Sequence, residues 1–390
     1  MQDLTAALSA RKQQQLYRTR QTLDGPQGVV VSIGGRDYLS FCSNDYLGLA
    51  NHPQLIAAFK EGVDRFGVGS GAAHLITGHS YAHQALEEEL AAFVGRPRAL
   101  LFSTGYMANL GVVTALTGRG DEIFEDRLNH ASLIDAAALS AAKLVRYPHN
   151  DMQALQQKLS ASQARQRLIA SDGVFSMDGD CARLVTMQAL ARQSDAWLLV
   201  DDAHGFGVLG EQGRGWCADQ LGAGADNVVL MATLGKALGT GGAFVAGSEA
   251  LVETLIQQAR TFIYTTAAPP ALAWATRAAL RLVQEGGDMR ERLLRNIDYF
   301  RRGAAELDVP LMASETAIQP VVVGAAGPAM ALSAALRQRG LLVTAIRPPT
   351  VPQGASRLRV TLSASHSLEQ LDRLLRALAD CYRECLHAAP

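Results

Sequence analysis

The sequence predicts an α/β protein with a large domain built on a mostly parallel sheet, and a smaller α+β domain after it. Three observations favour this class. Between about residues 55 and 245, short apolar runs alternate with helical patterns, as in parallel sheets covered on both faces. A length of 390 residues is more than one hydrophobic core usually serves. After about residue 285 the pattern changes to an arginine-rich helix and two short apolar strands.

We divide the chain into three parts. Residues 1–50 form an N-terminal arm, in which residues 1–20 read as an amphipathic helix and residues 28–49 as a hairpin that turns at two glycines. Residues 51–284 form the large domain. Residues 285–390 form the α+β domain, which a C-terminal helix closes.

The large domain contains the elements that place a site. Ligands bind to open parallel sheets at the carboxyl ends of the strands, so polar residues at those ends are candidate site residues. The predicted strands are 99–103, 122–126, 167–172, 196–202 and 227–233, and helices are predicted over 83–95, 108–116 and 184–194.

The bulk composition excludes several classes of function. A net charge of −1 gives no sign of nucleic acid or an anionic membrane as a partner. No apolar run approaches the roughly 18 residues that span a bilayer, and the N-terminus lacks the apolar core of a secretory signal. The five cysteines are scattered, and no further cluster completes a metal site with Cys381 and Cys385. We therefore expect reduced thiols, no metal and a cytoplasmic location.

The strand at 99–103 runs through Thr104 and Gly105 into a helix near Tyr106. Free N–H groups at a helix start attract anions, so this turn is a candidate phosphate site. Taken alone, it is more often an ordinary strand-to-helix connection.

Asp201, Asp202 and His204 follow the apolar strand that begins at residue 196. A carboxylate at the end of a buried strand is costly unless it meets a cation or hydrogen-bond donors. The protonated ring nitrogen of a bound heterocycle would supply that cation, and His204 would reach another edge of the same ligand. A metal pair or a buried ion pair is the alternative. A metal would need a third ligand close by, so a bound organic ligand is favoured.

Two other strand ends carry polar residues. Asp172, Ser176, Asp178 and Asp180 crowd the loop after 167–172, but this loop lacks the last glutamate and the flanking helices of a calcium site. His130 begins a helix after the strand at 122–126, and such a histidine is more often a cap or a surface residue than a catalytic one.

Lys236 stands in the glycine-rich stretch TLGKALGTGGA (233–243), in a chain where only five of the 36 lysines and arginines are lysines. A desolvated lysine loses its proton and becomes a nucleophile, which an arginine does not. Its natural covalent partner is an aldehyde. Pyridoxal phosphate offers an aldehyde, a pyridine nitrogen, a ring hydroxyl and a phosphate, and so uses all of these groups. The glycines are expected to give clearance to this flat cofactor.

Several stretches resemble the α-oxoamine synthases, fold-type-I pyridoxal phosphate enzymes that join a small amino acid to an acyl thioester. The resemblance extends over essentially the whole chain. It implies a seven-stranded, mostly parallel sheet, pyridoxal 5'-phosphate as cofactor and a homodimer with active sites at the subunit interface. The stretches are SNDYLGL (43–49), GSGAAHLITGHSYAHQALEEEL (69–90), DRLNHASLIDA (126–136), SDGVFSMDGD (171–180), VDDAHGFGVLGEQGRG (200–215) and TLGKALGTGGA (233–243).

The run RPPTVP (347–352) resembles one branch of the family. That branch condenses L-alanine with pimeloyl-CoA, or a pimeloyl carrier protein, to 8-amino-7-oxononanoate, CoA and CO₂ in biotin synthesis. One departure from the family pattern is at Ala73 and His74, where a serine followed by a basic or small residue is expected; this segment borders the acyl site.

The resemblance also implies roles for single residues. Lys236 would be the Schiff-base lysine, Asp201 would pair with the pyridine nitrogen, and His130 would stack on the cofactor ring. Arg359 would hold the amino acid carboxylate by a bidentate pair. The remaining implied contacts are Gly105, Tyr106, Ser176, His204 and Thr233 with the cofactor, and Arg18, Asn44 and Thr350 with the substrates.

Three alternatives stay open at this point. A sister α-oxoamine synthase would use glycine and a short acyl-CoA, as in synthesis of 2-amino-3-oxobutyrate or 5-aminolevulinate. A fold-type-I aminotransferase would use the same lysine. An inactive partner subunit is disfavoured, because Lys236, Asp201 and His204 are all present.

Overall fold

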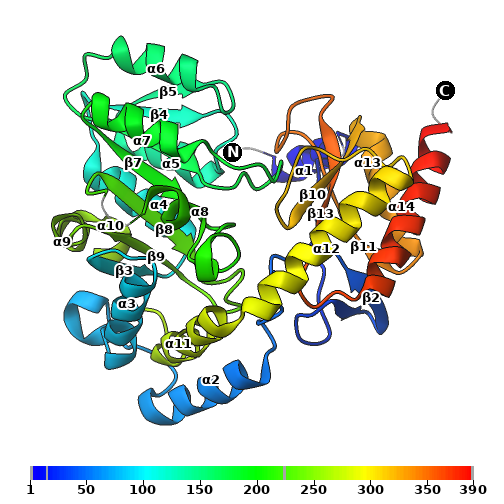
Figure 1. Ribbon diagram of the computed structural model, residues 1–390, viewed down its shortest axis with the longest axis horizontal. Coiled ribbons are helices and arrows are strands. Elements are labelled where there is room, and N and C mark those ends of the chain that lie inside the picture. The colour runs from blue at the N-terminus through cyan, green and yellow to red at the C-terminus, as the bar shows by residue number, and fades with distance from the viewer. Residues whose placement is uncertain (1–2, 15, 223–224, 388–390) are drawn as a thin grey trace.

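A computed structural model describes residues 3–14, 16–222 and 225–387, and the side chains of residues 3–14, 16–222 and 225–384. Its largest sheet has seven strands in the order β3-β9-β8-β7-β6-β4-β5 (Figure 1). All pairings are parallel except those of β9, which runs antiparallel to β3 and β8. The expected fold class is therefore confirmed. The strands are β3 (Arg98–Phe102), β4 (Glu122–Asp126), β5 (Lys143–Tyr147), β6 (Arg167–Asp172), β7 (Ala196–Asp201), β8 (Val228–Thr233) and β9 (Ala243–Gly247).

Helices cover both faces of this sheet because the strands are apolar on both sides. In β7, Leu198 and Val200 belong to one buried cluster, whereas Leu199 belongs to the cluster on the opposite face. The helices on the Leu199 face are α4 (Gly105–Leu116), α5 (Ala131–Ser140), α9 (Glu249–Gln258) and α10 (Arg260–Ile263). Those on the other face are α3 (Tyr81–Phe93), α6 (Met152–Ser160), α7 (Leu184–Gln193), α8 (Trp216–Leu221) and α11 (Pro270–Glu285), and α2 (Pro53–Phe66) packs against α11.

Two smaller sheets lie beside α12 (Gly287–Glu306), as Figure 1 shows. The predicted hairpin is confirmed, and its second strand pairs in parallel with β11 from the C-terminal part of the chain. The hairpin therefore shares a sheet with a segment about 300 residues further along, and the boundaries at residues 50 and 284 remain a proposal. The remaining elements are β1 (Val30–Ile33), β2 (Arg36–Ser40), β10 (Ile318–Gly324), α13 (Ala326–Gln338), β11 (Leu341–Leu342), β12 (Thr344–Ile346), β13 (Ser356–Thr361) and α14 (Leu368–His387).

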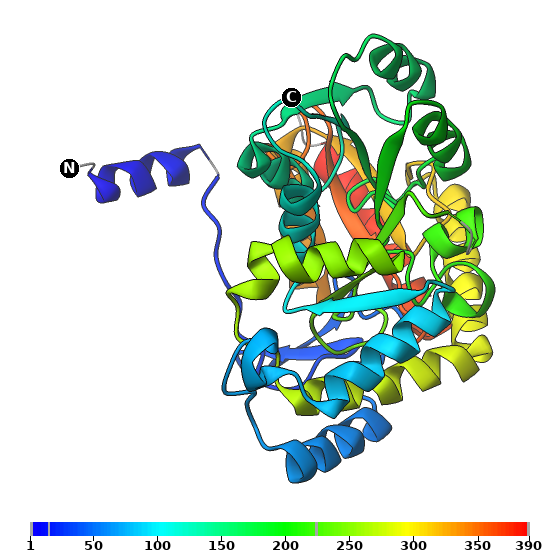
Figure 2. The same ribbon diagram turned by 90° about the vertical axis from the view of Figure 1, so that its left-hand side faces the viewer.

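The N-terminal helix is shorter than predicted. Helix α1 spans only Leu4–Gln13, and the side chain of Asp3 caps its start. Residues 16–23 have no regular secondary structure, and residues 1, 2 and 15 lie outside the described part. None of its residues is buried, and the helix stands away from the body of the molecule (Figure 2). The expectation of an amphipathic helix over 1–20 was wrong because the segment has no continuous apolar face to hold the later turns.

Two further expectations from the sequence concern membrane-spanning helices and cysteines. Among the helices that the structure describes, none combines the length and apolar character that a membrane span requires. Cys42, Cys181, Cys217 and Cys381 form no disulfide within the described residues, whereas the side chain of Cys385 lies outside the described part.

The stretch that carries Lys236 turns between β8 and β9 and rests on the chain near residue 50. Gly239 has a φ of +66°, and a Cβ added there would lie 2.4 Å from the nitrogen of Ala50 and 2.5 Å from the carbonyl carbon of Leu49. At this glycine, the clearance that we expected for a cofactor is taken up by the protein's own backbone. The turn is thus fixed against the segment that contains Tyr46.

We predict that Gly239→Ala lowers the free energy of unfolding by at least about 2 kcal/mol, because left-handed backbone strain and overlap with fixed backbone add up. Urea unfolding followed by circular dichroism measures this loss. Gly34→Ala is the matched control, since Gly34 has a φ of +59° but open space around it. It should cost only the strain, about 1 kcal/mol. Equal losses in both variants would contradict the role of the contact with residues 49–50.

Candidate functional site

The carboxyl ends of neighbouring strands bring the predicted residues together. Asp172 at the end of β6 is the register partner of Asp201 at the end of β7, and Asp201 is the partner of Met231 in β8. Lys236 follows β8 in the next turn, and His130 follows β4. We expected the site at this edge because open parallel sheets bind ligands at the carboxyl ends of their strands.

Lys236 is half-buried, and its Nζ lies 3.0 Å from Nε2 of His204. Burial of the amine lowers the pKa of Lys236 to about 8, and the charge of Arg359 acts in the same direction. Asp201 and Asp172 oppose this shift. A lysine with such a pKa keeps an appreciable neutral fraction near pH 7, as a nucleophile or base requires.

His204 lies between Lys236 and Tyr46. Its Nδ1 is 2.5 Å from the hydroxyl of Tyr46, a residue to which the sequence had given no role. Burial, with the charges of Lys236 and Arg359 nearby, lowers the pKa of His204 well below its usual value. The imidazole is therefore neutral at physiological pH.

Asp201 is buried and held by neutral donors. Its Oδ2 accepts a hydrogen bond of 2.8 Å from Nδ2 of Asn109, and its Oδ1 accepts one of 3.1 Å from the N–H of Ala203. Asn109, in α4, also donates to Oγ of Ser132. No ion pair involves Asp201 among the described residues, so its charge is free to meet a cation from a ligand.

His130 is the N-terminal cap of α5, which agrees with the plainer of the two interpretations of the sequence. Its Nδ1 lies 2.8 Å from Oγ of Ser132, and its backbone N–H donates to Oδ1 of Asp172. The ring is exposed and connected through Ser132 to Asn109, the donor to Asp201. Capping fixes the ring beside the site, which is compatible with a stacking role.

Gly105 and Thr233 meet at the start of α4. A Cβ on Gly105 would lie 2.6 Å from Cγ2 of Thr233, so only glycine fits there. The hydroxyl of Thr233 is buried and has no hydrogen-bond partner within the described residues. Tyr106 follows on the exposed side of the helix start and donates to Asp135. An orphaned hydroxyl beside free helical N–H groups is suited to an anion such as a phosphate.

Arg359 comes from β13 and is buried. Its Nε donates to the carbonyl of Ser176 at 2.6 Å, and both terminal nitrogens lie 3.2 Å from Oδ1 of Asn44. The structure thus brings Arg359, Asn44 and Ser176 together. Their proposed contacts with the substrate and the cofactor remain predictions.

Arg18 and Thr350 are exposed. Neither side chain makes a hydrogen bond or ion pair with any described residue. Arg347, near Thr350, donates to the carbonyl of Tyr17, next to Arg18. This hydrogen bond joins the N-terminal arm to the loop after β12. A cavity of about 620 Å³ opens there, lined by Gln14, Leu16, Gly324, Ala325, Ala326, Arg347, Pro348, Gln353, Gly354 and Ser356.

His74, which departs from the family pattern, belongs to a histidine cluster. Its Nδ1 lies 2.9 Å from Nδ1 of His79, and its ring stacks on Phe262. These two histidines and His83 form a group close enough to hold a metal ion. However, Nδ1 of His83 faces Ser80 and its Nε2 faces a backbone carbonyl, so His83 is already satisfied by protein groups.

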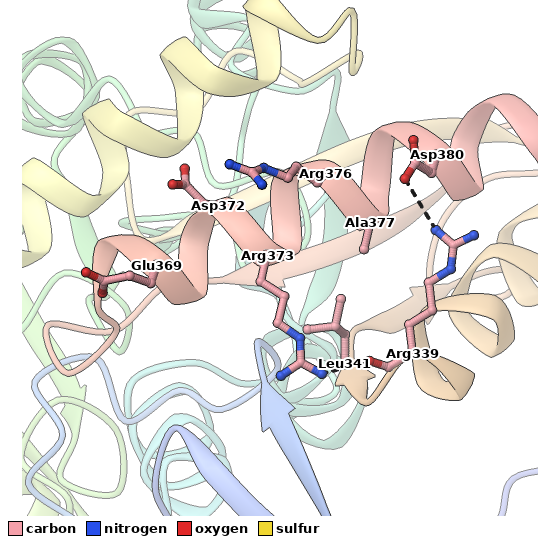
Figure 3. Close-up of a pocket in the computed structure, with 8 residues that line it drawn as sticks. All are labelled: Arg339, Leu341, Glu369, Asp372, Arg373, Arg376, Ala377 and Asp380. Atoms are coloured by element: carbon pink, nitrogen blue, oxygen red, sulfur yellow. Dashed lines mark hydrogen bonds and ion pairs between the residues drawn. The ribbon is translucent and has the colours of Figure 1, made fainter.

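A second hollow lies between α14 and β11, away from the predicted residues (Figure 3). Its volume is about 530 Å³. Arg339 pairs with Asp380 across it, and Arg373 donates to the carbonyl of Arg339. None of the predicted site residues lines this hollow, so it does not compete with the site around Lys236.

Tyr46 and Asn109 are the residues that the sequence reasoning missed. Tyr46 lies within the quoted stretch SNDYLGL, and Asn109 lies one helical turn after Gly105 on α4. A polar residue on an otherwise apolar helix was the only local signal for Asn109. For Tyr46, the signal was its position between Asn44 and the turn at Gly48.

The chain is similar to proteins of a known family. Residues 36–378 match the family model for class I and II aminotransferases. The chain is 61% identical over 372 residues to 8-amino-7-oxononanoate synthase from Nitrosococcus oceani, which covers 95% of this chain and 98% of that one.

Solved structures agree with this similarity. A serine palmitoyltransferase from S. paucimobilis, with PLP and myriocin bound, has a TM-score of 0.92 and 29% identity, and the match covers 98% of each chain. An 8-amino-7-oxononanoate synthase from Francisella tularensis has a TM-score of 0.77 and 33% identity, covering 89% of this chain and 98% of that one. The chain therefore belongs to the class I and II aminotransferase family, within the group of the 8-amino-7-oxononanoate synthases.

Proposed function

We propose that the chain condenses L-alanine with a pimeloyl thioester to 8-amino-7-oxononanoate, releasing CO₂ and the thiol, with pyridoxal 5'-phosphate as cofactor. The observation that carries this proposal is the amine of Lys236, which lies 3.0 Å from Nε2 of His204 and feels the charge of Asp201. The 61% identity to a named 8-amino-7-oxononanoate synthase supports the choice of substrates.

The residues of the site fit this cofactor. The orphaned hydroxyl of Thr233 and the start of α4 suit its phosphate, and Gly105 lets Thr233 approach this helix start closely. The buried carboxylate of Asp201 suits a protonated ring nitrogen. When bound, pyridoxal phosphate supplies an aldehyde for Lys236 and a sink for the electrons of a broken bond.

The residues of this chain then hold groups and move protons. The neutral amine of Lys236 is the base for the α-proton of alanine and returns a proton to the product. Asp201, fixed by Asn109 and the N–H of Ala203, would hold the ring nitrogen. Arg359, fixed by Ser176 and Asn44, orients the carboxylate that is lost as CO₂. His130, at the start of α5, would limit the position of the cofactor ring.

We predict that Lys236→Ala and Lys236→Arg both lower turnover at least about a thousandfold, because neither side chain provides a neutral amine. The absorbance band of the enzyme-bound cofactor should also disappear. Product is measured by mass spectrometry. Lys158→Ala, which removes another lysine from a surface helix, is the control and should keep both signals. Retention of turnover and of the band in Lys236→Ala would sink the assignment.

The substrate choice separates this function from its alternatives. L-alanine with pimeloyl-CoA should give product and one CO₂ per turnover, whereas glycine with acetyl-CoA or succinyl-CoA should react at least about tenfold more slowly, as one misfitting group costs about 1–3 kcal/mol. A pimeloyl carrier protein is tested in parallel. A preference for glycine would favour the sister synthases, and turnover without CO₂ would favour an aminotransferase.

We also propose a homodimer, supported by an exposed apolar patch beside the site. The patch consists of Val68, Leu75, Ile76, Tyr106 and Tyr264, which are 42–78% exposed. The elements that carry or adjoin these residues lie together, because the short helix η1 (His74–Gly78) contacts α10, and Thr261 of α10 donates to the carbonyl of Met107 near the start of α4. Apolar clusters of this kind mark interfaces. The expected cytoplasmic location stays a prediction.

We predict that wild-type protein has the mass of two chains in light scattering, and that Ile76→Asp shifts it to one chain, because a charge is placed in the middle of the patch. Val185→Asp is the control: Val185 is 57% exposed on α7, and this variant should keep the mass of two chains. A wild-type mass of one chain would remove the proposal.

A further inference from the structure

Tyr46 is buried against the site and bonded to its central histidine. The residue is 1% exposed, and its backbone carbonyl accepts a hydrogen bond from Ala364. Its hydroxyl lies 2.5 Å from Nδ1 of His204 and 3.4 Å from Oδ1 of Asn44. Burial raises the pKa of Tyr46 to about 12, although Arg359 acts in the opposite direction. The phenol therefore keeps its proton at physiological pH.

The proton of this hydroxyl has two acceptors within reach, and the geometry favours His204. A distance of 2.5 Å to Nδ1 is that of a short, strong hydrogen bond, whereas 3.4 Å to Asn44 is at the limit of one. Oδ1 of Asn44 already receives two hydrogen bonds from Arg359. If Nδ1 of His204 donated instead, the phenol proton of Tyr46 would have only the weak contact with Asn44, which favours the hydroxyl of Tyr46 as the donor to Nδ1.

This bond decides where His204 carries its own proton. A neutral imidazole has one donor and one acceptor nitrogen, so a ring that accepts at Nδ1 carries its proton on Nε2. Nε2 lies 3.0 Å from Nζ of Lys236. An N–H directed at this amine finds an acceptor only when the amine is neutral, because an ammonium group has no lone pair.

We propose that Tyr46 is a positioning residue: its hydroxyl fixes His204 as the Nε2–H tautomer, which presents a donor to Lys236 and favours its neutral amine. The value of this contact for catalysis rests on the proposed function, in which the neutral amine reacts. The tautomer itself is a property of the protein without cofactor and is tested independently of turnover.

Other charged groups face Lys236 and act on it in both directions. Asp201 at the end of β7 and Asp172 at the end of β6 favour the ammonium form, whereas Arg359 from β13 opposes it. His130, at the start of α5, acts on the charge of His204. All of them remain when only the hydroxyl of Tyr46 is removed, so Tyr46→Phe isolates the effect of the tautomer.

Nitrogen-15 NMR of the cofactor-free protein, labelled at histidine, tests the first step. Long-range proton–nitrogen correlations should show the Nε2–H pattern for His204 in the wild type. In Tyr46→Phe this pattern should give way to the Nδ1–H tautomer or a mixture. Tyr299→Phe is the matched control, because it removes a phenol hydrogen bond of the same length, 2.5 Å, to Asp372 on a distant helix pair. That variant should keep the wild-type pattern.

The reactivity of Lys236 tests the second step. Cofactor-free protein is exposed to pyridoxal 5'-phosphate at a series of pH values, reduced with borohydride, and the modified lysine is measured by mass spectrometry. In Tyr46→Phe the ammonium form can donate to an unprotonated Nε2, so the pH midpoint should rise by about half a unit to one unit, the effect of one hydrogen bond. The midpoint should not move in Tyr299→Phe.

Each outcome decides one step. An Nδ1–H pattern in the wild type overturns the proposal, and this measurement does not depend on whether Tyr46→Phe folds. An unchanged pattern in a folded Tyr46→Phe also overturns it. A changed tautomer with an unmoved midpoint would remove the step from His204 to Lys236. An inactive wild type that shows the Nε2–H pattern would count against the proposed function and leave the role of Tyr46 intact.

Discussion

The parallel register of β6, β7 and β8 is the constraint on which the site depends. Because Asp172 is paired with Asp201 and Asp201 with Met231, the three strands end at one edge and deliver their next residues to one place. Both faces of this sheet are packed against helices, so a slip of one residue would exchange the side chains fitted to each face and disrupt the packing on both. The geometry of the site is thus set by the packing of the core.

Within that frame, the site balances buried charges so that Lys236 sits near its point of protonation. Burial favours the neutral amine, while Asp201 and Asp172 favour the ammonium form. Burial and the neighbouring Asp201 also raise the pKa of Asp172 well above its usual value, which favours the neutral form of Asp172. A proton on Lys236 is therefore gained or lost at little cost, as acid–base work near neutral pH requires.

Local patterns in the sequence were enough to find the site residues that follow the ends of the strands. Asp201, His204 and Lys236 follow apolar runs at short distance, and the edge of a parallel sheet collects them. The partners that set their protonation could not be found in this way, because Tyr46 is 158 residues from His204 and Asn109 is 92 residues from Asp201. No periodicity encodes such contacts. The predicted length of the N-terminal helix was wrong because local helical propensity was all that supported it. Without a surface to pack against, propensity does not extend a helix.

Asp201 and Asp202 show that the direction of a side chain, as well as its type, decides what it can bind. Successive side chains at the end of a strand point to opposite sides, so Asp201 faces Asn109 while Asp202 accepts a hydrogen bond from the N–H of Cys217 at the start of α8. A Cβ on Gly205 or Gly215 would lie within 2.3 Å of the carboxylate oxygens of Asp202, so these glycines make room for a structural carboxylate. Two carboxylates that diverge in this way do not converge on one ion, and the metal-pair alternative loses its geometric basis.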